Sequence, residues 1–318
     1  MEKTINIDEI NIGQRIDLFL SKIYCEYSRR FFQQLIKLGY VKVNGQNIDP
    51  DYRLKQNDIL TINFPEFKSK RKYPNEFLNI IYEDDSILVI NKPAGINVHP
   101  PTNYPQLNNK DITILDILLD KYGTEPEDMV TEWVQRPFIV HRLDKYTSGV
   151  MVIAKNPKSQ FNLMKQFANR TITKIYLGIV YGEFIEKKGT ITAPIGRDYK
   201  NRTKFRVGYG RDSITEYHLL DKFDGYSLLE LRPLTGRTHQ IRVHLSSINH
   251  PILGDKTYIE LQKITDPKYV EINKLVNRQM LHSYKLILNH PETNNKLEFI
   301  AELPDDFLKI IDYLKNKK

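Results

Sequence analysis

The 318-residue chain contains a single cysteine, Cys25, and no long apolar run. One cysteine excludes an intramolecular disulfide and is typical of a protein in a reducing compartment. No stretch approaches the roughly 20 apolar residues that a membrane-spanning helix needs, and the first residues, MEKTINIDEI, lack the apolar core of a signal peptide. We therefore expect a soluble protein of the cytoplasm.

Several catalytic signatures are also missing. The chain has no GxSxG elbow, no GxGxxG after a strand and no Walker loop, which removes the usual signs of a hydrolase, a dehydrogenase or an NTPase. HRLD at 141–144 echoes the kinase catalytic loop, but there the aspartate directly follows the arginine, and a glycine-rich loop and DFG are lacking. His239, His244 and His250 match no zinc spacing. We expect no cofactor and no metal.

Positive charge is what the chain has in excess. Lys and Arg number 47 against 39 Asp and Glu, which leaves a formal charge of +8 and a pI near 9.2. Such a balance favours a polyanionic partner such as nucleic acid, although ordinary solubility charge gives the same count.

The N-terminal segment predicts a small unit of two helices and a hairpin. Apolar residues at helical spacing indicate a helix within 15–24, and a second follows over 28–39, with Ser28 as its N-cap and Gly39 at its end. Asn44-Gly45 predicts a tight hairpin turn, and 58–64 reads as a strand. Basic residues lie off the apolar stripes, where they form either a solvated face or an RNA-binding one: Arg15, Arg29, Arg30, Lys37 and Lys42.

A basic stretch with a proline near each end, PEFKSKRKYPNEF at 65–77, reads as a linker. We therefore divide the chain into residues 1–64, the linker 65–77 and a larger domain, 78–318. Short segments rich in β-branched and aromatic residues dominate this domain, separated by turn residues. They predict an α+β fold with a mainly antiparallel or mixed sheet and a few packed helices.

The motif VHRLDKYTSG, residues 140–149, places charged residues between two apolar stretches. It predicts a turn held by buried elements, in which Asp144 is either a turn cap or a reactive carboxylate. In a second motif, RPLTGRTHQIRVHL, Thr238 is expected to cap a helix that carries Arg242. A half-buried arginine needs a carboxylate, and we expect Asp144 to be the partner of Arg242, in a catalytic or a purely structural pair. Tyr176, on a strand, is a core aromatic or a face for stacking a base.

Two resemblances give these motifs a meaning. Residues 15–62 resemble the alpha-L RNA-binding motif, through the arginine pair before the second helix and the VNG hairpin. HRLDKYTSGVMVIAK, LRPLTGRTHQIRVHLSSINHPILGD, INKPAGINVHP, TKIYLGIVYG and RQMLHSYKL are similar to the signature segments of RluA-type pseudouridine synthases, most of all to their ribosomal RNA branch. Two features depart from the pattern: Tyr146 replaces a usually acidic or small residue, and 101–137 is longer than usual.

The resemblance implies an isomerase that converts uridine in RNA to pseudouridine without a cofactor. It implies Asp144 as the catalytic aspartate, Arg242 as its ion-pair partner, Tyr176 as the residue stacked on the base, and Arg142 as the residue that enters the RNA helix. The residues that we expect to contact RNA are Arg142, His141, Thr147, Arg237, His239, Gln240, Arg15, Arg29 and Arg30.

Ribosomal RNA is the expected partner, with transfer RNA as the alternative, and we expect a monomer. Two rival functions stay open. An RNA N-glycosidase breaks the same first bond but usually needs a second carboxylate, for which Asp255 and Glu230 are the nearest candidates. A non-catalytic RNA-binding or ribosome-assembly factor needs no chemistry at all.

Overall fold

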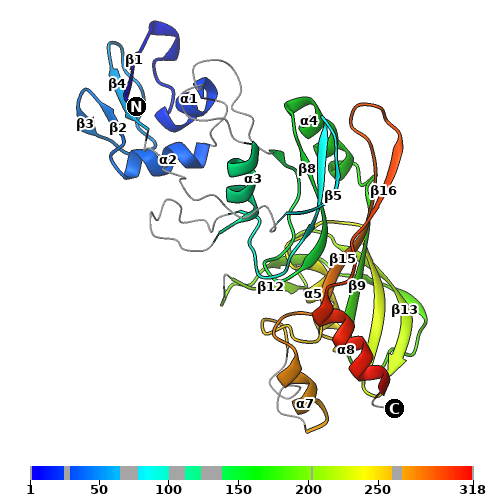
Figure 1. Ribbon diagram of the computed structural model, residues 1–318. Coiled ribbons are helices and arrows are strands. Elements are labelled where there is room, and N and C mark those ends of the chain that lie inside the picture. The colour runs from blue at the N-terminus through cyan, green and yellow to red at the C-terminus, as the bar shows by residue number, and fades with distance from the viewer. Residues whose placement is uncertain are drawn as a thin grey trace. The chain divides into compact units, whose positions relative to one another are not determined.

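The computed structural model describes residues 2–24, 29–64, 78–99, 112–122, 138–201, 203–259 and 267–316. These residues fall into two compact units: the described residues up to 64 belong to a small unit, and those from 78 onward belong to a larger one (Figure 1). The expected linker 65–77, the predicted cap Ser28 and most of the long segment 101–137 lie outside the described residues. The boundaries at 64 and 78 stay a prediction.

The small unit joins four antiparallel strands to two helices. The strands run in the order β1 (Glu2–Asn6), β4 (Ile59–Asn63), β2 (Val41–Val43), β3 (Gln46–Asn47). The helices are α1 (Ile16–Ile23) and α2 (Arg29–Lys37), preceded by a single 3-10 turn, η1 (Glu9–Asn11). Both predicted helices and the hairpin are confirmed.

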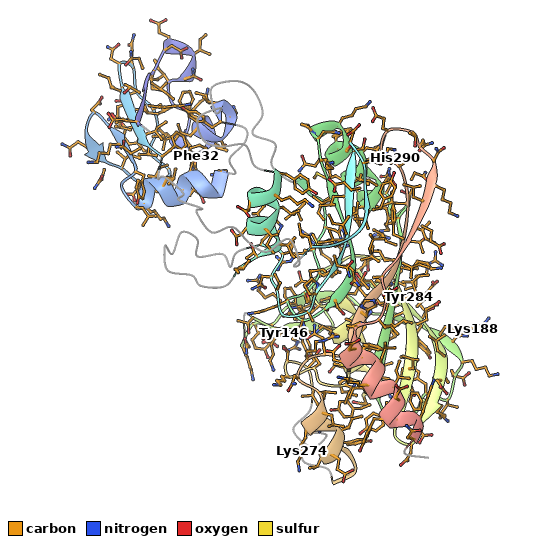
Figure 2. All side chains as sticks on the ribbon, in the orientation of Figure 1. Phe32, Tyr146, Lys188, Lys274, Tyr284 and His290 are labelled. Atoms are coloured by element: carbon orange, nitrogen blue, oxygen red, sulfur yellow. The ribbon has the colours of Figure 1, made fainter. Side chains whose placement is uncertain are left out.

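Local sequence explains these elements. Asn44 and Gly45 adopt φ of +50° and +77°, which few other residue pairs tolerate, so this dipeptide sets the β2–β3 turn. Phe32 is completely buried in the unit's core (Figure 2). Ile23, the last residue of α1, is apolar but 47% exposed.

The larger unit is built on one sheet of ten strands, and the predicted strand segments are confirmed. Its main order is β10-β13-β14-β9-β15-β8-β6-β5, with β16 paired to β15 and β7 to β8. All pairs are antiparallel except β15 with β8, so the sheet is mixed and the α+β class is confirmed. The strands are β5 (Asn79–Glu83), β6 (Ile87–Lys92), β7 (Phe138–Ile139), β8 (Ser148–Ala154), β9 (Thr173–Tyr181), β10 (Lys188–Thr192), β13 (Ile214–Phe223), β14 (Tyr226–Pro233), β15 (Leu281–Asn289) and β16 (Lys296–Ile300).

Helices pack on both faces of this sheet because alternate strand residues point to opposite sides. One set of apolar side chains joins β6 and β8 to α4 (Pro157–Ala168), and another joins β9 to α7 (Pro267–Leu275) and α8 (Asp305–Asn316). On β6 and β8 a further cluster receives α3 (Ile114–Tyr122), while β9 and β14 receive α5 (Gln240–Ser247). Tyr176 on β9 packs against both of these last two clusters.

The halves of the sheet meet where β8 begins. His282 and Ser283 of β15 pair in parallel with Ser148 and Gly149, and Ser283 also pairs with Tyr176 of β9. A Cβ atom on Gly149, whose φ is +113°, would lie 2.1 Å from the carbonyl oxygen of Ser283. Only glycine fits this position, and the loop that precedes β8 therefore ends at the junction.

None of the described helices combines the length and the apolar character that crossing a membrane requires.

Candidate active site

The loop that carries Asp144 joins β7 to β8 and is held by hydrogen bonds on several sides. The Thr147 backbone N–H donates to the carbonyl of Asp144 at 3.1 Å, closing a turn. The buried Thr147 hydroxyl accepts from the Gln279 side chain at 3.1 Å, and Arg278 donates to the carbonyl of Tyr146 at 3.2 Å. Arg278 in turn makes a two-pronged ion pair with Asp306 at the start of α8. The loop is therefore preorganised.

Lys92, at the end of β6, is a further support that sequence reasoning missed. Its fully buried ammonium donates to the carbonyls of Pro93, Ile96 and Lys145 at 2.8–3.2 Å. Burial lowers the pKa of Lys92 to about 7, with the charge of Asp144 opposing the change and that of Arg278 adding to it. The segment INKPAGINVHP contains this lysine, but the sequence does not reveal that its ammonium reaches carbonyls up to 53 residues away.

The second motif forms a turn and then α5. Its first helical residue is Gln240, whose buried amide accepts from the Thr235 hydroxyl and the Arg237 N–H and donates to the Ile214 carbonyl. The helix cap is His239, with φ of +57°, so the predicted cap at Thr238 is wrong by one residue. The reason is local: Gln240 bonds back across the turn, and the helix therefore begins one residue later.

Arg242, on the first turn of α5, is shared between two carboxylates. Its Nη1 donates to Oδ2 of Asp144 at 2.9 Å, while Nε and Nη2 donate to both oxygens of Asp255 at 2.6 and 2.8 Å. Burial opposes the charge of Arg242, but the hydrogen bonds and charges of the two aspartates outweigh it and raise its pKa above the ordinary value. The guanidinium is therefore permanently charged and cannot rotate away from Asp144.

The two carboxylates differ in access. The Asp144 side chain is 22% exposed, whereas that of Asp255 is 1% exposed. Asp255 also accepts from the backbone N–H groups of Thr257 and Tyr258, so its oxygens are occupied. Asp144 retains one oxygen, Oδ1, whose nearest basic group is Nε2 of His239 at 3.8 Å. Of the two aspartates, Asp144 is the one that a substrate can reach.

Tyr176 lies on β9 beside the junction with β15, half-buried. Burial, strengthened by the charge of Asp144 and opposed by a hydrogen bond with Ser283, raises the pKa of Tyr176 to about 12. Its hydroxyl is therefore protonated in neutral solution, and Asp144 is close enough to act on it electrostatically.

The remaining predicted contacts of the larger unit separate into two groups. Arg142 is exposed and Arg237 is half-buried, and the Arg237 side chain donates a hydrogen bond of 3.3 Å to the Asp212 carbonyl. His141 and Thr147 face inward. The His141 ring stacks on Phe167 and its Nε2 accepts from the Val152 N–H, and burial, helped by Lys174, lowers the pKa of His141 to about 3. Together with Gln240, these residues make hydrogen bonds within the protein around the site, and their predicted contact with RNA stays a prediction.

In the small unit, two of the three predicted arginines share one buried carboxylate. Asp17 is fully buried on α1 and accepts from Arg15, Arg29 and Gln33 at 2.7–3.1 Å. Both arginines remain partly exposed, at 33% and 44% of their side chains, so they present charge outward while their position is fixed. The side chain of Arg30 lies outside the described residues.

A basic and aromatic hairpin beside α5 was not singled out by sequence reasoning. Its strands are β11 (Ile195–Arg197) and β12 (Phe205–Val207), and β12 packs on α5 (Figure 1). Exposed side chains form its surface: Arg197, Tyr199, Lys200, Arg206, Tyr209 and Arg211. The alternation of Arg and Lys with Tyr over 197–211 was the available signal.

Phe205 of this hairpin contacts two residues of the site. Phe205 lies edge-on to His239, and its backbone N–H donates to the hydroxyl of Tyr258 at 3.0 Å. Tyr258 in turn lies under the guanidinium of Arg242, 5.0 Å from ring centroid to cation. Among the described residues no group of three or more His, Cys, Asp or Glu is arranged to hold a metal ion.

Comparison with known proteins places this arrangement in a family. The model of the RNA pseudouridylate synthase family matches residues 86–247, a span that includes both Asp144 and Arg242, and the model of the S4 domain matches residues 14–60. The chain belongs to the RNA pseudouridylate synthase family, and it is an isomerase that converts uridine in RNA to pseudouridine.

Individual relatives match over nearly the whole chain. An uncharacterized RNA pseudouridine synthase, YlyB of Bacillus subtilis, is 36% identical over 98% of this chain and 97% of its own. Ribosomal large subunit pseudouridine synthase D of Buchnera aphidicola is 40% identical over 94% of each chain. Among solved structures, human RNA pseudouridylate synthase domain containing 1 is 27% identical, covers 77% of this chain and 90% of that one, and has a TM-score of 0.57.

Proposed function

We propose that this enzyme isomerises specific uridines of large-subunit ribosomal RNA and that Asp144 is its catalytic carboxylate. The observation that carries the proposal is the pairing of Asp144 with Arg242: the carboxylate is held at one oxygen, reachable at the other, and lies inside the family-matched span. Relatives named ribosomal large subunit pseudouridine synthase D, from Buchnera aphidicola and Haemophilus influenzae, support the choice of RNA.

The isomerisation of uridine requires one reactive carboxylate. Isomerisation breaks the bond from uracil N1 to the sugar, turns the base, joins C5 to the sugar and releases the C5 proton, with no net oxidation or reduction. A carboxylate serves either by attacking the sugar or base or by removing a sugar proton. In both routes the carboxylate reacts as an anion, and the permanently charged Arg242 lies 2.9 Å from its Oδ2.

The base must leave the RNA stack before it meets Asp144. Tyr176 offers an aromatic face on the floor of the site, and stacking is worth about 1–3 kcal/mol per base, enough to hold a detached uracil while it turns. Arg142, exposed two residues before Asp144, is our candidate for filling the gap in the RNA.

Two basic surfaces are suited to the RNA backbone. The β11–β12 hairpin places cations and tyrosines directly beside α5, and cation–π contacts of Arg206 with Tyr199 and Tyr209 keep these side chains ordered. The S4 domain adds Arg15 and Arg29, which Asp17 holds in place. We propose that the enzyme acts as a monomer in the cytoplasm.

The N-glycosidase alternative needs a second carboxylate that activates water. Asp255 is the nearest, and its oxygens already accept from Arg242 and from two backbone N–H groups. A carboxylate that is 1% exposed and accepts from Arg242 at both oxygens is poorly placed to activate a water, which supports isomerisation over hydrolysis.

A purified assay tests the proposal. RNA transcribed with tritium at uridine C5 releases that label only when C5 loses its proton. We expect release from large-subunit ribosomal RNA by the parent enzyme and none by Asp144→Asn, which keeps the size of the side chain and its contact with Arg242. Release from transfer RNA alone would contradict the proposed substrate, free uracil would indicate a glycosidase, and an active Asp144→Asn would remove the catalytic role.

A further inference from the structure

His239 lies beside Asp144, and its backbone and ring geometry point to a more specific role than the RNA contact expected from the sequence. His239 caps α5 in a left-handed conformation, with φ of +57°. This conformation costs free energy for a non-glycine residue and is kept only where the surrounding structure imposes it. Its ring stands edge-on to both Phe205 and Tyr258, so its orientation is also fixed. Nε2 faces Oδ1 of Asp144 at 3.8 Å.

The hydrogen-bond pattern favours one tautomer of the His239 ring. Nδ1 lies 2.7 Å from the hydroxyl of Tyr258, and that same hydroxyl accepts the backbone N–H of Phe205. Among the described residues the Tyr258 hydroxyl has no acceptor within hydrogen-bond distance other than Nδ1 of His239. With one lone pair of the hydroxyl taken by the Phe205 N–H, we assign the hydroxyl hydrogen to Nδ1, which in a neutral ring leaves the proton on Nε2.

The charges around the ring agree with this tautomer. Burial lowers the pKa of His239, and Arg242 and Arg142 lower it further against the opposing effect of Asp144 and Asp255, so the ring is neutral at pH 7. An Nε2–H directed at Oδ1 of Asp144 attracts the carboxylate, whereas a bare Nε2 would repel it. The distance of 3.8 Å exceeds a hydrogen bond, as catalytic contacts often do before substrate binds.

We propose that His239, as the neutral Nε2–H tautomer set by Tyr258 and the Phe205 N–H, is a positioning residue that holds the reactive oxygen of Asp144. Arg242 fixes Oδ2 and His239 restrains Oδ1, so the plane of the carboxylate is defined from both sides. The inference rests on the proposed catalytic role of Asp144. The proposal also connects the basic hairpin to Asp144, because Phe205 of β12 contacts both Tyr258 and His239.

Two substitutions at His239 separate positioning from packing. Asn places its amide nitrogen where Nδ1 stands and tolerates positive φ, so the backbone is preserved but the donor no longer reaches Asp144. Gln places an N–H near the position of Nε2. We expect His239→Asn to lower kcat about tenfold or more with KM within about twofold, and His239→Gln to recover most of that loss. Parent-like kcat in His239→Asn, or equal losses in both variants, would overturn the proposal.

Tyr258→Phe tests the source of the tautomer. The ring under Arg242 remains, while the hydroxyl and its hydrogen bonds with the Phe205 N–H and His239 are lost, so we expect a several-fold lower kcat at a KM within about twofold of the parent. Tyr82→Phe is the matched control, because it removes a hydroxyl that donates to Asp84 at 2.7 Å in β5, away from the loop. A Tyr258→Phe variant as active as the parent would contradict this step.

Magnetic resonance of isotope-labelled histidine rings reads the tautomer directly in the full chain. The signal of His239 is identified by its loss in His239→Gln. We expect a protonated Nε2 and a bare Nδ1, and a shift of the proton toward Nδ1 in Tyr258→Phe; a protonated Nδ1 in the parent would contradict the assignment. The two proposals fail separately: an active Asp144→Asn removes the catalytic role, whereas an inactive Asp144→Asn with a parent-like His239→Asn removes only the positioning role.

Discussion

At the scale of single residues, the site depends on one arginine serving two carboxylates. Asp255 takes two of the Arg242 nitrogens and leaves the third for Asp144. The stronger, buried pair thus fixes the guanidinium, and the weaker contact leaves Asp144 with a reachable oxygen. Asp144 alone would be a partly exposed aspartate in a turn, and the pairing is what makes it a candidate reagent.

Tyr176 offers a prediction at the same scale. If its ring face holds the base, Tyr176→Phe should bind ribosomal RNA within about twofold of the parent, because the face is kept. Tyr176→Ala should lose about 1–3 kcal/mol of binding free energy, the usual contribution of one stacked base. Titration of a labelled RNA fragment measures both affinities. A large loss in the Phe variant would mean that the hydroxyl, which contacts Ser283, carries the interaction instead.

At the scale of elements, the junction of β8 with β15 decides where the loop of Asp144 lies. Gly149 and Gly208 both have strongly positive φ, at +113° and +105°, but only Gly149 has backbone within reach of a Cβ atom. Gly208→Ala should therefore cost about 1–3 kcal/mol of strain, whereas Gly149→Ala should cost clearly more, because β8 and β15 must separate. Thermal melting of the two variants compares them, and equal melting temperatures would show that the junction tolerates the added carbon.

The helices of the S4 domain offer a pH-dependent prediction. Burial alone would raise the pKa of Asp17, but hydrogen bonds from Arg15, Gln33 and Arg29 outweigh it and lower the pKa below its ordinary value. The stabilisation is thus complete above the unfolded pKa of about 4 and is lost as pH falls through the lower folded value.

We expect Asp17→Asn to destabilise the small unit at neutral pH by about 1–3 kcal/mol and to remove this acid sensitivity. Hydrogen exchange of residues 2–64 in the full chain measures it locally. Asp8→Asn, at an exposed aspartate of the same unit, is the control and should leave protection unchanged. Equal protection in the two variants would mean that the Asp17 cluster does not stabilise the unit.

At the scale of the whole molecule, sequence patterns predict what is locally determined. Apolar spacing predicted α1, Asn44-Gly45 predicted the β2–β3 hairpin, and short segments rich in β-branched and aromatic residues predicted the strands of the larger sheet. The contacts that shape the site could not be found in this way, because they join distant segments. Arg278 meets the carbonyl of Tyr146 across 132 positions, and backbone carbonyls carry no residue identity to detect.

The same limit applies to the details of the motif around α5. The pattern indicated a helix with Arg242 near its start, but the cap moved from Thr238 to His239 because Gln240 bonds across the turn. The role of Asp255 was also hidden: its sequence context is that of a turn, which it does serve, while its main partner is Arg242.

Mapping of pseudouridine in cellular RNA tests the central claim most directly. Carbodiimide labelling and primer extension on total RNA would be compared in cells with the gene, without it, and complemented with either the parent or Asp144→Asn. We predict that defined uridines of large-subunit ribosomal RNA lose modification in the deletion, regain it with the parent and stay unmodified with Asp144→Asn. Modification restored by Asp144→Asn, or no site that changes in ribosomal RNA, would contradict the account.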